Sequence, residues 1–210
     1  GFFGSSKTMN EENYLLQKLA RRYGTNNVDN CTRMCHASTV WALRTSLGAG
    51  AMTNSMEDLM NEADVLWIQG ANPAEQHPIA NSNYFRQAVL DGATVIQVDP
   101  HANKTTRSFE IEDTDRHQHL QLEPGTDIPL LNIVLKTVLE NDWVDEEFIA
   151  ERTEGIEDLR ETLEDFDKEA AAEECGVPLE DIELAAEKYA NADNAAIFTG
   201  MGMSQHTCGV

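Results

Sequence analysis

The residues of this chain best suited to take part in chemistry are the adjacent pair Cys35 and His36. A thiolate is a soft metal ligand, and a neighbouring imidazole can take up or release a proton near neutral pH. The pair therefore indicates chemistry at a metal ion or acid–base chemistry. A buried cysteine beside a surface histidine would give the same pattern, and the spacing of the two residues alone favours this simpler interpretation.

The other cysteines, Cys31, Cys175 and Cys208, do not extend this pair into a recognisable motif. An iron–sulfur site formed by this chain alone would need closely spaced thiolates, and only Cys31 lies near Cys35 in the sequence. Four cysteines among 210 residues are also too few for a disulfide framework. We expect Cys31 to be a bystander and Cys175 to be structural.

The elements that must position this pair alternate between strands and helices from Ser55 onward. This alternation predicts an α/β fold, with a Rossmann-like, doubly wound and mainly parallel sheet and helices on both faces. Residues 103–118 are polar without clear periodicity and predict a surface loop. Strands are expected at 65–68, 95–98, 119–122 and 195–198, the first and last of them buried. Helices are expected at 10–22, 56–61 and 79–90, after Asp127 as the helix cap, and in short pieces within 142–191.

Each expected strand is followed by a loop with glycine, proline or an acid, at 70–73, 99–101, 124–127 and 200–202. In parallel sheets, ligands bind beyond the carboxyl ends of the strands. Glycines there let backbone N–H groups approach phosphates, and acids accept hydrogen bonds from a base or ribose. One such loop is usually only a turn, but four on one edge predict a nucleotide-like ligand. The absence of G-x-G-x-x-G and of a P-loop argues against an ordinary nicotinamide site.

The chain is strongly acidic. Asp and Glu number 37 against 15 Lys and Arg, for a net charge of −22, which disfavours binding to nucleic acid or to an anionic membrane surface. Lysine is scarce, with six against nine arginines, and this composition is typical of salt-in halophiles, although an ordinary acidic protein also fits. The 41% of hydrophobic residues allow a sizeable core, and no stretch approaches the roughly 20 apolar residues of a membrane span.

The acidity is unevenly distributed along the chain. Residues 1–60 hold six bases and five acids, so the remaining residues carry −23. This contrast indicates a buried anionic partner of the first segment, such as a phosphate-bearing cofactor.

Longer motifs surround Cys35 and His36. The stretch Gly-Thr-Asn-Asn-Val-Asp at 24–29, followed by Arg-Met-Cys-His-Ala-Ser-Thr-Val at 33–40, resembles the molybdenum-ligand segment of formate dehydrogenases in the molybdopterin oxidoreductase family. The resemblance continues in the family's order and covers residues 1–210. Its further motifs lie at 48–55, 72–75, 77–78, 99–100, 124–127, 146–155 and 200–207.

The resemblance implies a molybdenum or tungsten ion between two molybdopterin guanine dinucleotides, with Cys35 as protein ligand to the metal. His36 would be a catalytic residue that positions substrate or transfers a proton. Formate would be oxidised to carbon dioxide, and electrons would leave through an electron-transfer subunit or carrier.

The resemblance also implies that the chain is the central piece of a longer, cytoplasmic catalytic subunit and is inactive by itself. Its [4Fe-4S] cluster would belong to a missing N-terminal part. Residues 1–36 would be a fragment of a split molybdopterin-binding domain, and residues 37–210 would be the Rossmann-like dinucleotide-binding domain.

Dinucleotide contacts carry over from the family onto the strand-end loops. His101 departs from the arginine that the family often has there, which puts a guanidinium contact in doubt. Related nitrate reductases have methionine after the ligand cysteine, so His36 favours formate. Nitrate reductase, another molybdopterin oxidoreductase and a non-catalytic Rossmann-like scaffold are the alternatives. The residues to which the resemblance assigns dinucleotide contacts are Gly70, Asn72, Glu75, Gln76, Asp99, His101, Gly125, Thr126, Asp127, Met201 and Gln205.

Overall fold

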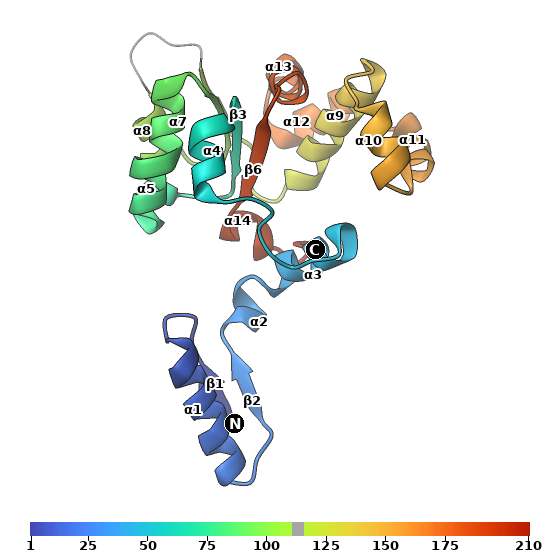
Figure 1. Cartoon of the computed structure of the whole chain (residues 1–210). Coiled ribbons are helices and arrows are strands. Elements are labelled where there is room, and N and C mark those ends of the chain that lie inside the picture. Colours follow the sequence, from blue (N-terminus) through green and yellow to red (C-terminus); the bar gives the residue numbers. More distant parts are fainter. Residues whose placement is uncertain (111–115) are drawn as a thin grey trace. The chain divides into compact units, whose positions relative to one another are not determined.

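A computed structural model describes residues 1–110 and 116–210 of the chain (Figure 1). The described residues form two units, residues 1–53 together with 201–210, and residues 54–200. Each unit is built around its own parallel strands.

The larger unit is built on a four-stranded sheet with the order β5-β4-β3-β6. Its strands are β3 (Val65–Gln69), β4 (Thr94–Val98), β5 (His117–Leu120) and β6 (Ala195–Thr199), and every neighbouring pair is parallel. The chain moves outward from β3 to β4 and β5, and β6 then adds to the other side of β3. The predicted α/β fold with a parallel sheet is confirmed. The direction of winding reverses between β3 and β6, which is where ligands bind in such folds.

Helices cover both faces of this sheet, because successive side chains of a strand point to opposite sides (Figure 1). Trp67 packs in one core with α9 (Asp127–Glu140), α12 (Lys168–Cys175) and α13 (Leu179–Ala190). Leu66 packs in the other core with η1 (Asn81–Phe85), α7 (Arg86–Asp91) and α8 (Lys104–Phe109). The unit also contains α4 (Met56–Glu62), α5 (Pro73–Gln76), α6 (Pro78–Ala80), α10 (Glu146–Arg152) and α11 (Ile156–Glu164).

Several predicted elements are confirmed within this unit. The predicted helix at 79–90 corresponds to α6, η1 and α7, which follow one another without a break from Pro78 to Asp91. The acidic segment at 142–191 forms α10 to α13. Serine at the start of α4 explains why that short helix begins where it does: the Ser55 hydroxyl accepts from the Asp58 N–H, and the Asp58 carboxylate accepts from the Ser55 N–H.

The prediction of a surface loop over residues 103–118 is wrong. Asn103 caps α8 by accepting hydrogen bonds from the backbone N–H groups of Thr105 and Thr106, and β5 begins at His117. Phe109 and both threonines of α8 are buried. Because two of the buried residues are polar, the helix lacks the apolar periodicity that sequence reasoning needs. Residues 111–115 of this segment lie outside the described residues.

The prediction that the last strand is buried is also wrong for the described part of the chain. β6 is at the edge of the sheet, its residues alternate between exposed and half-buried, and the Ile197 side chain is 53% exposed. An apolar run does not by itself distinguish a central strand from an edge strand, since only the strand order decides which faces are covered.

The smaller unit contains the Cys35-His36 pair. Strands β1 (Phe2–Gly4) and β2 (Val28–Asn30) are parallel, and α1 (Asn10–Arg22) connects them over the predicted range. At its start, the N–H of the cap residue Met9 donates to the Glu12 carboxylate at 2.9 Å. The unit is completed by α2 (Thr32–Cys35), α3 (Ala37–Leu47) and α14 (Met201–Ser204).

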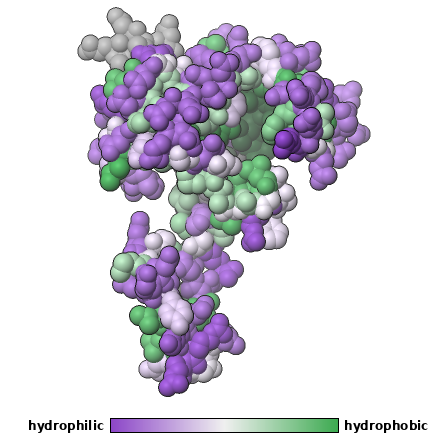
Figure 2. Space-filling view, viewed as in Figure 1, coloured by the Kyte–Doolittle hydropathy of each residue, from purple (hydrophilic) through white to green (hydrophobic). Residues whose placement is uncertain are grey.

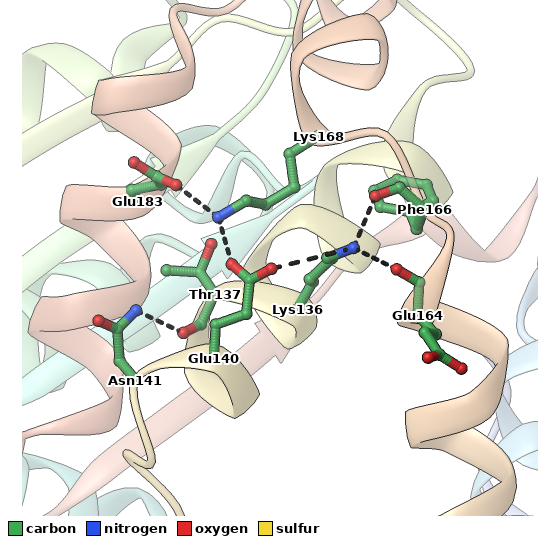
Figure 3. A network of polar contacts seen from close by, with 8 residues as sticks. All are labelled: Lys136, Thr137, Glu140, Asn141, Glu164, Phe166, Lys168 and Glu183. Atoms are coloured by element: carbon green, nitrogen blue, oxygen red, sulfur yellow. Dashed lines mark hydrogen bonds and ion pairs between the residues drawn. The ribbon is translucent and has the colours of Figure 1, made fainter.

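Two lysines hold the acidic helices of the larger unit together (Figure 3). Lys168 on α12 is 2.7 Å from carboxylate oxygens of both Glu140 on α9 and Glu183 on α13. Burial alone would lower the pKa of Lys168, but the two carboxylates outweigh burial and raise it. Lys136 donates to the carbonyl oxygens of Glu164 and Phe166, at 2.8 and 2.9 Å. Lys136 and Lys168 therefore link negatively charged helices to one another.

None of the helices in the described ranges is long and apolar enough to cross a membrane. Hydrophilic residues cover most of the visible face of the larger unit (Figure 2). The interpretation of this charge as a halophilic adaptation stays a prediction.

We expect the stability of the 210-residue chain to depend strongly on salt. Its net charge of −22 opposes folding by self-repulsion, and the Debye length falls from about 10 Å at 0.1 M to about 3 Å at 1 M salt. The midpoint of thermal unfolding should rise by more than about 5 °C over this range of KCl. Sucrose at low salt strengthens burial without screening charge, so it should give a smaller rise than KCl. An unchanged midpoint in KCl would contradict the charge argument.

Candidate functional site

The carboxyl ends of all four strands of the larger unit lie on one edge of the sheet, because every pair is parallel. Backbone hydrogen bonds join the end of β3 and the loop after it to the ends of the neighbouring strands β4 and β6. The Gly70 N–H donates to the Val98 carbonyl of β4 at 3.0 Å, and the Gly200 N–H donates to the Gln69 carbonyl of β3 at 2.9 Å. The structure therefore brings together loops that are more than 100 residues apart in sequence.

Gly200 lies where the loops after β3 and β6 approach each other closely. A Cβ atom on this residue would lie 2.7 Å from the Ala71 Cβ and 2.8 Å from the Ala71 Cα, and closer still to the Gly70 carbonyl oxygen. No side chain fits there without moving backbone. Glycine is thus required by close approach at the point where the winding of the sheet reverses.

The loop after β3 forms a polar cluster with the start of α8. The Asn72 side-chain amide donates to the Glu75 carboxylate at 2.6 Å, and its Oδ1 accepts from the Thr105 hydroxyl at 2.9 Å. The Lys104 ammonium is 2.7 Å from Glu75, and Lys104 first and Asn72 second lower the pKa of the Glu75 carboxyl. Glu75 and Gln76 are exposed on α5. Sequence reasoning missed Lys104 and Thr105 because it assigned them to a loop.

The loop after β4 is ordered by Asp99. Its carboxylate accepts from the His101 N–H at 2.9 Å and from the Asn103 amide at 3.2 Å, and its carbonyl oxygen is 2.9 Å from the His119 Nε2. His101 itself is exposed. Gln97, the residue before the end of β4, is fully buried, and its Oε1 has no hydrogen-bond partner among the described residues. A buried acceptor of this kind is costly unless a ligand or water supplies a donor.

The segment after β5 ends in the N-terminus of the 14-residue helix α9. Gly125 has a φ of +93°, and a Cβ there would meet nothing within 4 Å. Thr126 is buried and donates from its hydroxyl to the Glu123 carbonyl at 2.7 Å. The prediction that Asp127 caps α9 is wrong, because Thr126 is the cap residue and Asp127 is the first residue of the helix. The Asp127 carboxylate accepts from the amide of Gln69 at 2.8 Å.

In the smaller unit, Cys35 ends α2 and His36 lies between α2 and α3. Both are half-buried, and the Cys35 Sγ is 3.7 Å from the Met201 Sδ. The Gln205 amide donates to the Met34 carbonyl at 3.2 Å. Met201 and Gln205, which the sequence assigned to a strand-end loop, therefore lie beside the Cys35 segment in this unit. A thiol with a thioether neighbour on a half-buried turn is suited to binding a soft metal ion.

Of the predicted site residues, Cys35, His36, Met201 and Gln205 belong to the smaller unit, and the others belong to the carboxyl edge of the larger unit. Sequence reasoning also missed the buried Gln69 and Gln97. The signal that marks them is a polar residue near the end of an otherwise apolar strand, in Val-Leu-Trp-Ile-Gln and Thr-Val-Ile-Gln-Val.

Comparison with known proteins gives matches over the whole chain. A family model described as Molybdopterin oxidoreductase matches residues 1–210. The alpha subunit of the F420-dependent formate dehydrogenase of Methanocaldococcus jannaschii is 41% identical over 100% of this chain and 30% of its own length. The alpha subunit of F420-dependent formate dehydrogenase 1 of Methanococcus maripaludis is 42% identical, again over 100% of this chain and 30% of its own length.

Formate dehydrogenase H of Escherichia coli is 40% identical over 99% of this chain and 28% of its own length. The chain therefore spans less than a third of the relatives it matches. Among solved structures, acetylene hydratase from Pelobacter acetylenicus matches 96% of this chain and 26% of its own chain with a TM-score of 0.75. At 22% identity, this last similarity supports the fold alone.

Proposed function

Because the chain belongs to the molybdopterin oxidoreductase family, we propose that it is the central part of the catalytic subunit of a formate dehydrogenase. The observation that carries the proposal is about 40% identity, over essentially the whole chain, to formate dehydrogenases of Methanocaldococcus jannaschii, Methanococcus maripaludis and Escherichia coli. The substrate would be formate and the product carbon dioxide, with one proton and two electrons released.

The cofactor in this proposal is molybdenum or tungsten bound by two molybdopterin guanine dinucleotides. When bound, it would supply the two-electron acceptor and a binding position for the substrate. Cys35 would be the protein ligand to the metal, since a thiolate suits a soft or borderline metal ion. His36, the next residue, would position formate or hold the proton that the reaction releases.

Three features of the carboxyl edge fit a ligand with phosphates and a purine. The N-terminus of the 14-residue helix α9 is suited to a phosphate, and the space beside Gly125 is open. The Asp127 carboxylate can accept hydrogen bonds from the N–H groups of a guanine. The buried Gln97 Oε1, which has no hydrogen-bond partner among the described residues, could accept a hydrogen bond from the ligand. From these features and from the resemblance to the family, we propose that the following residues contact the dinucleotides: Gly70, Asn72, Glu75, Gln76, Asp99, His101, Gly125, Thr126, Asp127, Met201 and Gln205.

The remainder of the proposal concerns the whole protein. A [4Fe-4S] cluster and an electron-transfer subunit or carrier would take the electrons away, and the subunit would be cytoplasmic. Within this chain, residues 1–36 would belong to a split molybdopterin-binding domain and residues 37–210 to the dinucleotide-binding domain.

The test is turnover by the intact protein, purified from its natural host with its cofactor. We expect formate oxidation with an artificial electron acceptor, together with about one molybdenum or tungsten per chain. Nitrate reduction without formate oxidation would replace the proposal by a nitrate reductase. Intact protein that purifies without metal from a host that makes the cofactor would favour a non-catalytic scaffold.

A further inference from the structure

A buried glutamine links the core of the larger unit to the carboxyl edge of its sheet. Gln69 is 1% exposed and Trp67 is 2% exposed. The Trp67 indole N–H donates to the Gln69 Oε1 at 2.9 Å, and the Gln69 Nε2 donates to the Asp127 Oδ1 at 2.8 Å. Two hydrogen bonds in series therefore connect a core tryptophan with a carboxylate at the start of α9.

The direction of this chain of hydrogen bonds is fixed by chemistry. An indole N–H is a donor only, so the carbonyl oxygen of the Gln69 amide must face Trp67. The NH₂ group of the amide then must face Asp127, which receives the bond as an acceptor. Burial removes the water that could take over the bond between Trp67 and Gln69, and this bond strengthens the next by polarising the amide. The bond from Gln69 therefore restrains one oxygen of Asp127.

A carboxylate has about four lone-pair sites, so the bond from Gln69 uses only part of the acceptor capacity of Asp127. Guanine has adjacent N–H donors on its base-pairing edge, and two parallel N–H groups match the two acceptors of a carboxylate. Cytosine and adenine have an acceptor nitrogen on that edge, which would face a carboxylate oxygen without a hydrogen. A site whose polar group is left unpaired by the wrong ligand discriminates strongly.

We propose that Trp67 and Gln69 are positioning residues that orient the Asp127 carboxylate and so select guanine as the base of the bound dinucleotide. This inference rests on the proposed function, and it adds the determinant of base recognition. Asp127 is half-buried, and the bond from the fully enclosed Gln69 amide fixes the direction in which its carboxylate points. A carboxylate that is already oriented binds its ligand more tightly, because less conformational entropy is lost on binding.

The main variant is the double substitution W67F/Q69M in the full-length holoenzyme. It removes the donor and the acceptor of the buried bond together, so neither group is left unpaired, but the smaller phenylalanine leaves a cavity in the core. Thr137→Val is the control: it removes a buried hydroxyl with no hydrogen-bond partner among the described residues, from the same helix α9. The measurements are the GMP, CMP and AMP released per chain by acid hydrolysis, and the midpoint of thermal unfolding.

We expect W67F/Q69M to retain about tenfold less GMP per chain than the wild type, as the loss of one oriented, charge-assisted contact implies. Its unfolding midpoint should fall below that of the Thr137→Val control, because phenylalanine is smaller than tryptophan, so GMP is compared at a temperature where both variants are folded. Asp127→Asn should show a similar loss, and W67F/Q69M added to Asp127→Asn should cause no further loss. A purely structural role would instead give additive losses.

A second variant keeps the test decisive if W67F/Q69M does not fold. Gln69→Met alone keeps the volume of Trp67 in the core and removes the amide that donates to Asp127. The same loss of GMP is expected. Wild-type amounts of GMP in both folded variants would overturn the inference and leave the proposed function intact. A wild-type protein that releases no guanine nucleotide would instead contradict the proposed function.

Discussion

Replacing Cys35 with serine in the full-length protein is expected to lower formate oxidation more than about 100-fold, equivalent to more than ~2.7 kcal/mol of transition-state stabilisation. In the proposed function, the thiolate is the only ligand that this chain gives to the metal. A serine hydroxyl stays protonated near neutral pH and is a harder ligand, so it does not replace a thiolate at a soft metal site. The metal bound per chain should fall together with the activity.

The control for this variant is Cys31→Ser. Cys31 is exposed and lies four residues earlier, in the same unit, where its sulfur accepts a hydrogen bond from the Ser6 N–H at 3.2 Å. A hydroxyl can accept the same bond, so formate oxidation and metal content should stay near wild-type values. If Cys35→Ser oxidises formate at the wild-type rate with the wild-type metal content, Cys35 is not the ligand.

Gly200→Ala is expected to destabilise the larger unit by about 3 kcal/mol, the upper part of the range for inserting atoms into a packed site. The added Cβ would lie 2.7 Å from the Ala71 Cβ and 2.8 Å from its Cα. Since the obstacle is mostly backbone, the loops after β3 and β6 must separate. The unfolding midpoint of the full-length protein should fall, and the dinucleotide content should fall with it because these loops form the proposed binding edge.

Two further variants test whether the close approach of the two loops causes the loss of stability. Thr199→Ala removes atoms from the neighbouring exposed position and should change the stability by no more than about 0.5 kcal/mol. Adding Ala71→Gly to Gly200→Ala removes one of the colliding atoms but leaves the Gly70 carbonyl in place, so it should restore only part of the stability. Wild-type stability and cofactor content in Gly200→Ala would show that the close approach of the two loops is not needed.

Several helices and strands could be predicted from the sequence, because their formation depends on the local spacing of apolar residues. The helical spacing at 10–22 and the apolar runs of β3 and β4 predicted elements that the structure contains. The alternation of strands and helices predicted the parallel sheet, and parallel strands necessarily place their carboxyl ends on one edge. For this reason, the pattern of strands alone was enough to group the strand-end loops.

What the sequence missed has one physical cause, which is that burial depends on the order of the strands and on partners far away in the chain. α8 was predicted as a loop because its buried residues include Thr105 and Thr106, and β6 was predicted as buried because its apolar run does not reveal an edge position. The contact between Cys35 and Met201 joins residues 166 positions apart, and the bond from Gln69 to Asp127 joins residues 58 apart.

The sequence by itself thus determined which residues could bind a metal ion, a phosphate or a purine, because side-chain chemistry and local spacing are written in it. Only the tertiary structure decided how those residues are held. It joined the buried Gln69 to Asp127 at the carboxyl edge and required glycine at position 200, because both depend on the distance between β3 and elements that follow it much later in the chain. Local periodicity contains no information on such distances.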